Sequence, residues 1–477
     1  MTNPSHHIGF ISTRFAGTDG VSLETQKWAT VFERLGHQCF YFAGECDRNS
    51  DQSQVTPEAF YRHPEIDKIN QQAYSGSWTV TKKARSEHPE IAALQKDFFS
   101  IYVRPPQMTR RVNELKEHIK TELYKFARRF EVEILVIENA VTIPLNLPLG
   151  LAITEFIAET GYPTIAHHHD FHWERQRFQV NCVGDYLAAA FPPTLPSIRH
   201  VVINSLQAQQ IASRYGVTSR VIPNVMDFDS PPPAPDAYTQ NIRADFGIEQ
   251  GEYFFLQPTR VIQRKGIEHA VELVRRLGVP AKLVISHASG DEGSDYEQRV
   301  REYARLLDVT IRFEADQVQD ERGLTIDGKR IYTLGDVYPH ADLVTYPSSI
   351  EGFGNAFLEA VYYRRPILVN NYSIYEVDIK PKGFRAVWFD GFISIDTLKK
   401  VREILLDPAE AQAWAEENYQ LAKRYFSFTV LERRLQSILS QIVWDSRYEH
   451  RHSALFRPAH CRRRGKCDRA SCAIDVC

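Results

Sequence analysis

The sequence predicts an α/β protein with two domains, each built on a doubly wound parallel sheet. Short apolar segments, which predict buried strands, alternate along the chain with segments whose apolar residues recur at helical spacing. The chain has 477 residues, enough for two domains of ordinary size. A stiff run of prolines at residues 230–235 (SPPPAP) is unsuited to a sheet and separates the part of the chain that predicts the first domain from the part that predicts the second.

The chain begins with a βαβ unit, the start expected of a doubly wound sheet. Residues 7–12 (HIGFIS) predict a strand, residues 23–35 an amphipathic helix and residues 39–43 a second strand. The turn before the helix carries Gly17 and Gly20 but lacks the spacing G-x-G-x-x-G. A dinucleotide-binding fingerprint is therefore absent.

The alternation of predicted strands and helices continues in both halves of the chain. Residues 47–105 are an exception, since they are polar with few periodic signals. In the first half it predicts helices at 115–130, 151–159 and 207–215, and strands at 133–138, 164–169 and 201–205. In the second half it predicts strands at 253–258, 282–287, 309–313, 341–346 and 366–370, with helices between them and long helices at 409–425 and 430–444.

The predicted organisation divides the chain into five parts. They are an N-terminal domain (1–229), a linker (230–250), a C-terminal domain (251–410), C-terminal helices (411–445) and a basic, Cys-containing tail without fixed structure (446–477).

Composition indicates a globular protein and excludes several classes. Apolar residues make up 43% and charged residues 25% of the chain, and the net charge of -3 does not favour nucleic-acid or membrane-surface binding. We find no apolar run of transmembrane length and no signal peptide, so a cytoplasmic location is expected. Four of the seven cysteines crowd the tail without the C-x2-C pairs of common zinc sites. These are Cys461, Cys467, Cys472 and Cys477.

The most informative stretch is 346–366 (YPSSIEGFGNAFLEAVYYRRP). It predicts a strand end, a Gly-bearing loop and a helix N-terminus, the arrangement that binds ligands in open parallel sheets. Free N–H groups at a helix start favour an anion. The carboxylates of Glu351 and Glu359 frame this turn and are suited to accept hydrogen bonds from hydroxyls. The alternative is that Glu351 caps the helix and Glu359 lies on its solvated face.

This stretch resembles a known signature. Glu351, Gly352, Gly354, Glu359 and Ala360 match the E-x7-E motif of retaining GT-B glycosyltransferases in the glycogen-synthase-like group, family 4. The resemblance spans roughly residues 8–442 and implies two Rossmann-like domains that face an interdomain cleft. It also implies that Glu351 lies beside the donor sugar and that Glu359 binds the ribose hydroxyls of the nucleotide.

A second match follows the first strand of the C-terminal half. Arg260 and Lys265 match the family's G-R-x4-K-G motif, with Thr259 in place of Gly. Guanidinium and ammonium groups just before a helix suit a diphosphate, although a basic loop at a sheet edge is the alternative. The resemblance gives Gln263 and Arg264 no role.

A dense polar stretch contains three consecutive histidines. Because faces alternate along a strand, His167 and His169 share one face and His168 takes the other. A metal site is not favoured here, because no second cluster supplies obvious partners. The histidine-rich strand resembles the family strand whose His reaches the donor sugar, which selects His169 and then Asp170.

The resemblance assigns the other candidate residues. Arg175 and Arg177 are candidates for an anionic acceptor group, or else surface arginines. The catalytic residues expected are Glu351, His169, Arg260 and Lys265, and the donor-binding residues are Gly17, Gly20, Gly352, Phe353, Gly354, Asn355 and Glu359. A segment at 221–227 (VIPNVMD) resembles the family's V-I-P-N-G-V-D strand, with Val225 in place of Gly.

The resemblance implies hexose transfer from a nucleotide-diphosphate sugar to a hydroxyl-bearing acceptor, with retention and without a metal or other cofactor. No Asp-x-Asp motif is placed to hold a metal. Three alternatives are a GT-B phosphorylase, a nucleotide-sugar 2-epimerase and a non-catalytic nucleotide-sugar-binding protein. The sequence leaves the donor base, the sugar, the acceptor and the oligomeric state open.

Overall fold

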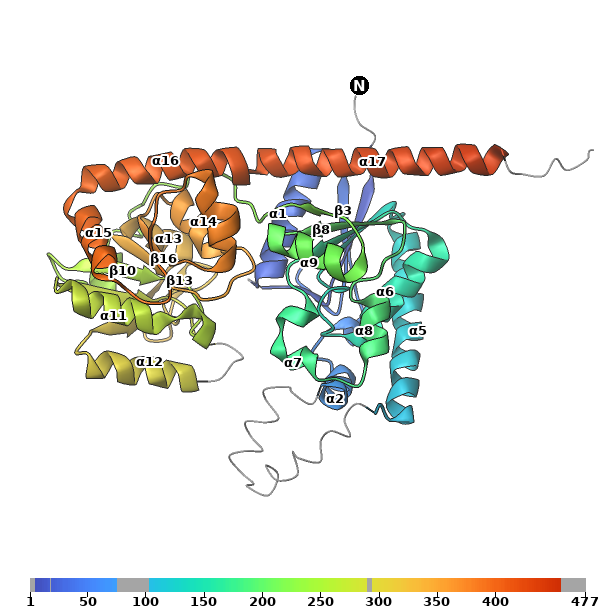
Figure 1. The fold of residues 1–477 in the computed structure, drawn as a ribbon, viewed down its shortest axis with the longest axis horizontal. Coiled ribbons are helices and arrows are strands. Elements are labelled where there is room, and N and C mark those ends of the chain that lie inside the picture. Colours follow the sequence, from blue (N-terminus) through green and yellow to red (C-terminus); the bar gives the residue numbers. More distant parts are fainter. Residues whose placement is uncertain (1–4, 18, 75–102, 290–293, 456–477) are drawn as a thin grey trace, which may run out of the picture. The chain divides into compact units, whose positions relative to one another are not determined.

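The computed structural model describes residues 5–17, 19–74, 103–289 and 294–455. The chain divides into two compact units, Met1–Arg434 and Leu435–Cys477. The first unit contains two large parallel sheets (Figure 1). Residues before the proline run form one sheet, and residues after it form the other. The described part of the second unit is the end of helix α17 (Phe428–Leu455).

The N-terminal sheet has seven parallel strands in the order β5-β3-β1-β6-β7-β8-β9. Strand order reverses between β1 and β6, and in such sheets ligands bind beyond the carboxyl ends of the strands at that reversal. The strands are β1 (His7–Ile11), β3 (Gln38–Ala43), β5 (Ser53–Val55), β6 (Ile134–Glu138), β7 (Thr164–His168), β8 (Ile198–Val202) and β9 (Ser219–Val221).

Helices cover both faces of this sheet, because its strands are apolar on both sides. On one face, Phe126 of α5 (Pro106–Arg129) and Ile153 of α6 (Leu147–Thr160) join a core cluster with Ile137 of β6. On the other face lies α1 (Gly20–Arg34), whose Phe32 ring packs 6.1 Å from that of Phe10. Helix α9 (Ser205–Tyr215) packs on β8 and β9.

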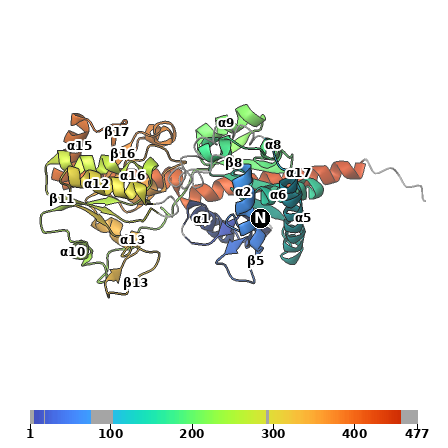
Figure 2. The same cartoon turned by 90° about the horizontal axis from the view of Figure 1, so that it is seen from below.

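The C-terminal sheet has six parallel strands in the order β12-β11-β10-β15-β16-β17, so its reversal lies between β10 and β15. Figure 2 shows α12 and α15 on one side of this sheet and α10 and α13 on the other. The strands are β10 (Tyr253–Gln257), β11 (Ala281–Ile285), β12 (Ile311–Phe313), β15 (Leu343–Tyr346), β16 (Ile367–Asn370) and β17 (Val387–Phe389). The helices are α10 (Ile242–Asp245), α11 (Ile267–Leu277), α12 (Asp295–Leu306), α13 (Leu334–Val337), α14 (Asn355–Tyr362), α15 (Ile395–Leu406) and α16 (Pro408–Phe426).

Smaller elements complete the described chain. Two strand pairs lie outside the large sheets: β2 (Arg14–Phe15) with β4 (Glu45–Cys46), and the antiparallel pair β13 (Gly323–Leu324) with β14 (Arg330–Ile331). Short helices are α2 (Pro64–Ala73), α7 (Gln176–Gln179), α8 (Gly184–Ala190), 3-10 turns at Pro57–Ala59, His172–Glu174, Gln263–Lys265, Tyr338–His340 and Lys380–Lys382, and a π-helical turn at Tyr375–Ile379.

Two predicted elements differ at their ends. Helix α5 begins at Pro106 rather than at residue 115, with proline in the first turn, where its missing N–H costs nothing. Helix α17 continues to Leu455, where the sequence predicted a tail from residue 446, because no Gly or Pro interrupts it before Pro458. The four tail cysteines lie outside the described residues, and the predicted domain limits stay a prediction. In the described part of the chain, no helix is both long and apolar enough to span a membrane.

Candidate active site

The loops after β10 and β15 meet at the strand reversal of the C-terminal sheet. The Ser349 N–H donates to the Arg264 carbonyl at 2.9 Å. Gly266 adopts the left-handed conformation (φ 58°), and a Cβ there would lie 2.6 Å from the Pro347 carbonyl oxygen. This close approach brings the basic motif and Glu351 together, because the two loops leave neighbouring strands.

Glu351 forms a buried ion-pair cluster with the basic loop. Lys265 Nζ donates to Glu351 Oε1, and Arg264 Nη1 donates to Oε2 at 3.1 Å. The Glu351 and Lys265 side chains are only 9% and 11% exposed. Burial alone would raise the pKa of Glu351, but Lys265 and then Arg264 outweigh it and hold the pKa below its usual value. Glu351 is therefore an ionised carboxylate between two cations.

Arg264 is the functional candidate that the sequence missed. Its partner is 87 residues away along the chain, so spacing carries no signal for the pair. Arg260, in contrast, is exposed, and its charge lowers the pKa of both His287 and Lys265, secondary to burial in each case. The basic loop thus keeps Lys265 and Arg264 on Glu351 and presents Arg260 outward.

The N-terminus of α14 is shaped by Gly354. This residue has φ 126°, and a Cβ there would collide with the hydroxyl of Tyr372, which donates to the Phe353 carbonyl at 2.9 Å. Phe353 is 2% exposed and packs in the core, so this donor-binding candidate is buried as a whole residue. Helix α14 thus starts at a fixed turn, with its first N–H groups outside the intrahelical ladder.

The other donor-binding candidates of this loop are engaged within the first unit. Gly352 accepts a hydrogen bond at its carbonyl from Asn204 Nδ2 at 2.7 Å, and Asn355 Oδ1 accepts one from Asn224 Nδ2 at 2.7 Å. Glu359 accepts from the Tyr338 hydroxyl at 2.8 Å, and burial raises the pKa of Glu359. Glu351 and Glu359 therefore occupy different electrostatic environments, an ionised cluster and a phenol-capped pocket.

The first turn of the N-terminal sheet holds the two glycines. Gly17 has φ 72°, and its N–H donates to Asp47 Oδ2 at 3.2 Å. Gly20 is the first residue of α1, whose N-terminus is capped by Asp19 through the Val21 and Ser22 N–H groups at 3.1 and 3.3 Å. A Cβ on Gly20 would lie 4.0 Å from Asn355 Nδ2, which places this turn near the start of α14.

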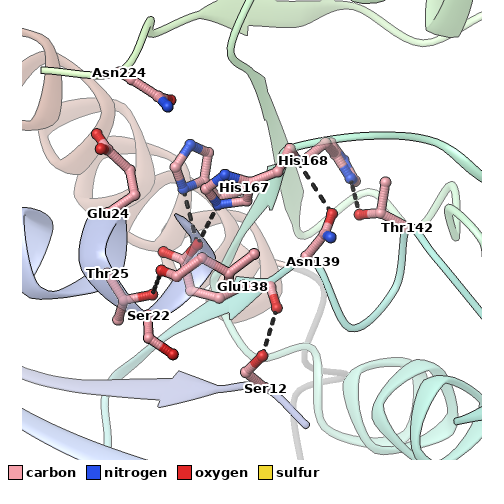
Figure 3. Close-up of polar contacts among 12 residues, drawn as sticks. Ser12, Ser22, Glu24, Thr25, Glu138, Asn139, Thr142, His167, His168 and Asn224 are labelled. Atoms are coloured by element: carbon pink, nitrogen blue, oxygen red, sulfur yellow. Dashed lines mark hydrogen bonds and ion pairs between the residues drawn. The ribbon is translucent and has the colours of Figure 1, made fainter. Parts of the chain in front are cut away.

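The histidine run ends β7 beside the end of β6 (Figure 3). His167 Nδ1 and His169 Nε2 both donate to Glu138 Oε2, at 2.9 and 3.0 Å. His168 faces the other way and is hydrogen-bonded to Thr142 Oγ1 at 2.5 Å. The predicted division of faces is confirmed. The sequence showed no obvious partner for these histidines, and the structure supplies one, Glu138, the last residue of the neighbouring parallel strand.

Electrostatics distinguish the members of this cluster. Burial alone would raise the pKa of Glu138, but His167 and His169 lower it to about 2. Burial lowers the pKa of His169, but the hydrogen bond to Glu138 and the negative charge of nearby carboxylates, Glu138 first, together outweigh it, and the net shift of the pKa is upward. Burial prevails at His167, whose pKa is lowered. Glu138, His167 and His169 are also the residues that could hold a metal ion among those described.

The acceptor candidates follow the histidines. Arg175 Nε donates to Asp170 Oδ2 at 2.6 Å, and Asn139 Nδ2 donates to Asp170 Oδ1 at 3.0 Å. Arg177 packs over the Phe178 ring at 4.6 Å. Asp170 and Arg175 are thus brought together, whereas Arg177 extends along an aromatic surface.

A separate cavity lies away from these residues, beside β12–β14. It measures about 970 Å³ and is lined mainly by acidic and amide side chains around β12–β14. Repulsion from its carboxylates disfavours a diphosphate there. The residues selected from the sequence do not line it.

Replacing Gly266 by Ala is expected to destabilise the protein more than replacing Gly278. The two glycines flank α11 with φ 58° and 62°, so both alanine variants incur the same left-handed backbone strain of about 1–2 kcal/mol. Only at Gly266 does the new Cβ meet a carbonyl, that of Pro347, whereas nothing lies within 4 Å at Gly278. Urea unfolding of the two variants measures the difference, and equal losses would contradict the close contact between the loops.

Known proteins resemble this chain over most of its length. Residues 239–421 match the family model "Glycosyl transferases group 1". The mannosylglucosylglycerate synthase of Petrotoga mobilis is 31% identical over 80% of this chain and 86% of its own length. The enzyme of the same name from Thermotoga maritima is 28% identical over 91% of this chain and 99% of its own.

A solved structure shares the fold over most of the chain. The Anabaena Alr3699/HepE protein in complex with UDP-glucose superposes with a TM-score of 0.57 at 11% identity, over 91% of this chain and 99% of its own. The predicted GT-B fold and the predicted enzyme class are confirmed. The chain therefore belongs to the glycosyl transferases group 1 family and is a glycosyltransferase.

Proposed function

We propose that this glycosyltransferase moves a mannosyl unit from a nucleotide-diphosphate sugar to glucosylglycerate, with retention at the anomeric carbon, to form mannosylglucosylglycerate. The product is the one in the names of two relatives that match most of the chain. The observation that carries the proposal is the cluster of Lys265, Arg264 and Glu351 at the strand reversal of the C-terminal sheet. A cytoplasmic location stays a prediction.

The donor diphosphate is held by protein groups in this proposal. Arg260 offers an exposed guanidinium, and the buried Lys265 ammonium is paired with Glu351. A guanidinium binds two phosphate oxygens with its planar fork, and an ammonium acts as a point charge. The first N–H groups of α14 add a partial positive charge. These groups replace the metal ion that holds the diphosphate in other transferases.

The transfer step needs no covalent enzyme intermediate. The acceptor hydroxyl attacks the anomeric carbon from the side on which the bond between this carbon and the phosphate oxygen breaks. The electron pair of the broken bond passes to the phosphate oxygen. The same oxygen takes the proton of the acceptor hydroxyl, so charge balances. Lys265 and Arg260 stabilise the charge on the leaving diphosphate, and His169 and Glu351 hold hydroxyls of the sugar.

The acceptor is an anion, because glycerate carries a carboxylate. The candidates for its recognition are Arg175 and Arg177, which follow the histidine strand. Arg175 already contacts the Asp170 carboxylate at 2.6 Å, which orients its guanidinium. An arginine fork is suited to a second carboxylate on the ligand.

A transfer assay tests the proposal. UDP-, GDP- and ADP-linked mannose and glucose are each incubated with glucosylglycerate, and the product is identified by mass and by anomeric NMR couplings. We expect mannosylglucosylglycerate from one mannosyl donor with the donor's configuration kept, and no change in donor KM on adding Mg²⁺. An inverted linkage, or release of nucleotide without a glycoside from every pair, contradicts the proposal.

Replacing Arg260 by Ala is expected to weaken nucleoside diphosphate binding by about 10- to 150-fold, since a charge-assisted hydrogen bond contributes about 1.5–3 kcal/mol. Isothermal titration measures this, with the free nucleoside as a ligand whose affinity does not change. Arg275→Ala, an exposed arginine at the other end of α11, is the matched control. Equal diphosphate affinity in wild type and Arg260→Ala contradicts the phosphate contact.

A further inference from the structure

The carboxyl ends of β6 and β7 bring three metal-binding side chains into one buried cluster. The strands are parallel neighbours, and their register pairs Glu138 with His167. His169 lies two residues further along, so its ring is on the same side as that of His167. One donor atom from each of the three side chains lies within 4.8 Å of the others. All three residues are buried.

Hydrogen bonds within the cluster leave two polar atoms unused. Both imidazoles donate to Glu138 Oε2, while Oε1 of the same carboxylate is buried without a hydrogen-bond partner (Figure 3). His167 Nε2 is likewise buried and unpartnered. A buried polar atom without a hydrogen-bond partner is costly in the interior, and such atoms are normally hydrogen-bonded or bound to a metal. The cluster is therefore incomplete as a hydrogen-bonded network.

We propose that Glu138, His167 and His169 bind one divalent transition-metal ion, with Zn²⁺ the best match. Two imidazole nitrogens and one carboxylate form a ligand set that zinc uses, whereas Mg²⁺ and Ca²⁺ prefer oxygen alone. Ligand atoms about 2.0–2.1 Å from a tetrahedral ion lie about 3.3 Å apart. The nitrogen-to-oxygen distances here are 2.9 and 3.0 Å, so small side-chain shifts suffice.

Surrounding contacts fix the ligands in place. The Trp28 ring stacks on His167 with centroids 4.1 Å apart. The backbone of His169 donates to Asn139 Oδ1 at 3.1 Å and accepts from Gln207 Nε2 at 3.0 Å. His168 is excluded, because it faces Thr142 and lies 2.9 Å from a ring nitrogen of His200. The ion would cross-link two strands and orient His169, whatever sugar the enzyme transfers.

Metal content of the tag-free, full-length protein tests this site. Wild type, Glu138→Gln and His200→Asn are stripped with a chelator, loaded with Zn²⁺, desalted and measured by mass spectrometry. All three keep the tail cysteines, so zinc on thiolates cancels in the comparison. We expect one zinc fewer per chain in Glu138→Gln than in wild type and His200→Asn. Equal zinc content in all three overturns the proposal.

Cobalt substitution of the wild type needs no variant to fold. Co²⁺ bound to imidazole and carboxylate shows visible d–d bands, whereas thiolate ligands add an intense charge-transfer band in the near ultraviolet. With thiols blocked by alkylation, we expect the d–d bands to reach their maximum at one Co²⁺ per chain. Absence of these bands, with no rise in unfolding temperature on adding Zn²⁺, means that the cluster is a hydrogen-bonded network only and overturns the proposal.

Discussion

Replacing Glu351 by Gln is expected to lower the turnover number by about 10²–10³, the loss typical when one preorganised electrostatic group leaves a closed site. In this structure the carboxylate also pairs with Lys265 and Arg264 and offsets one of their two charges. Its removal leaves both cations for the diphosphate, so the variant should bind free nucleoside diphosphate at least as tightly as wild type. Steady-state kinetics and calorimetric titration measure the two effects separately.

The opposite directions of these effects make the result specific. Glu403→Gln, at an exposed glutamate on α15, makes the same change in charge outside the loops after β10 and β15 and should alter neither quantity. A near-normal turnover number in Glu351→Gln contradicts the role of this carboxylate at the reacting sugar. Weaker nucleotide binding contradicts the competition between Glu351 and the diphosphate for Lys265.

Replacing Lys265 by Met should destabilise the protein by about 3–5 kcal/mol, because the change leaves Glu351 buried with one partner fewer. The double variant Lys265→Met/Glu351→Gln should be more stable than the sum of the single losses, since it removes both members of the pair. The control Lys125→Met removes a surface ion pair with Glu122. The Lys125 side chain is 63% exposed, so this change should cost about 0.5 kcal/mol of stability or less. Urea unfolding of the five proteins gives the coupling free energy, and additive losses contradict the buried pair.

Most strands and helices of the two sheets follow from sequence patterns, because each buried strand is a short apolar run between amphipathic helices. Residues 7–12 and 253–258, for example, predict β1 and β10 to within a residue or two. Element ends are less certain, since they depend on local chemistry. Proline at position 106 starts α5 early, and the lack of Gly or Pro extends α17. The hairpin β13–β14 contains two residues in each strand, too few to give a periodic signal.

The candidate site was predictable where its residues lie in one motif and not where they meet across the fold. Glu351 and Lys265 were selected from separate motifs, but their mutual ion pair joins residues 86 positions apart. Arg264 had no assigned role for the same reason. Glu138 could have been found, because it ends the strand before the histidine strand and parallel neighbours end at one edge of a sheet. The roles of the selected residues in catalysis stay predictions.

A crystal structure with a bound nucleoside diphosphate tests the central claim most directly. We expect both phosphates beside the loops after β10 and β15, within hydrogen-bond distance of Arg260 and Lys265, with the ribose hydroxyls on Glu359. Lys265 Nζ should then be shared between Glu351 and the β-phosphate. A nucleotide bound in the acidic cavity around β12–β14, or anywhere that leaves Arg260 and Lys265 without phosphate contacts, would contradict the site.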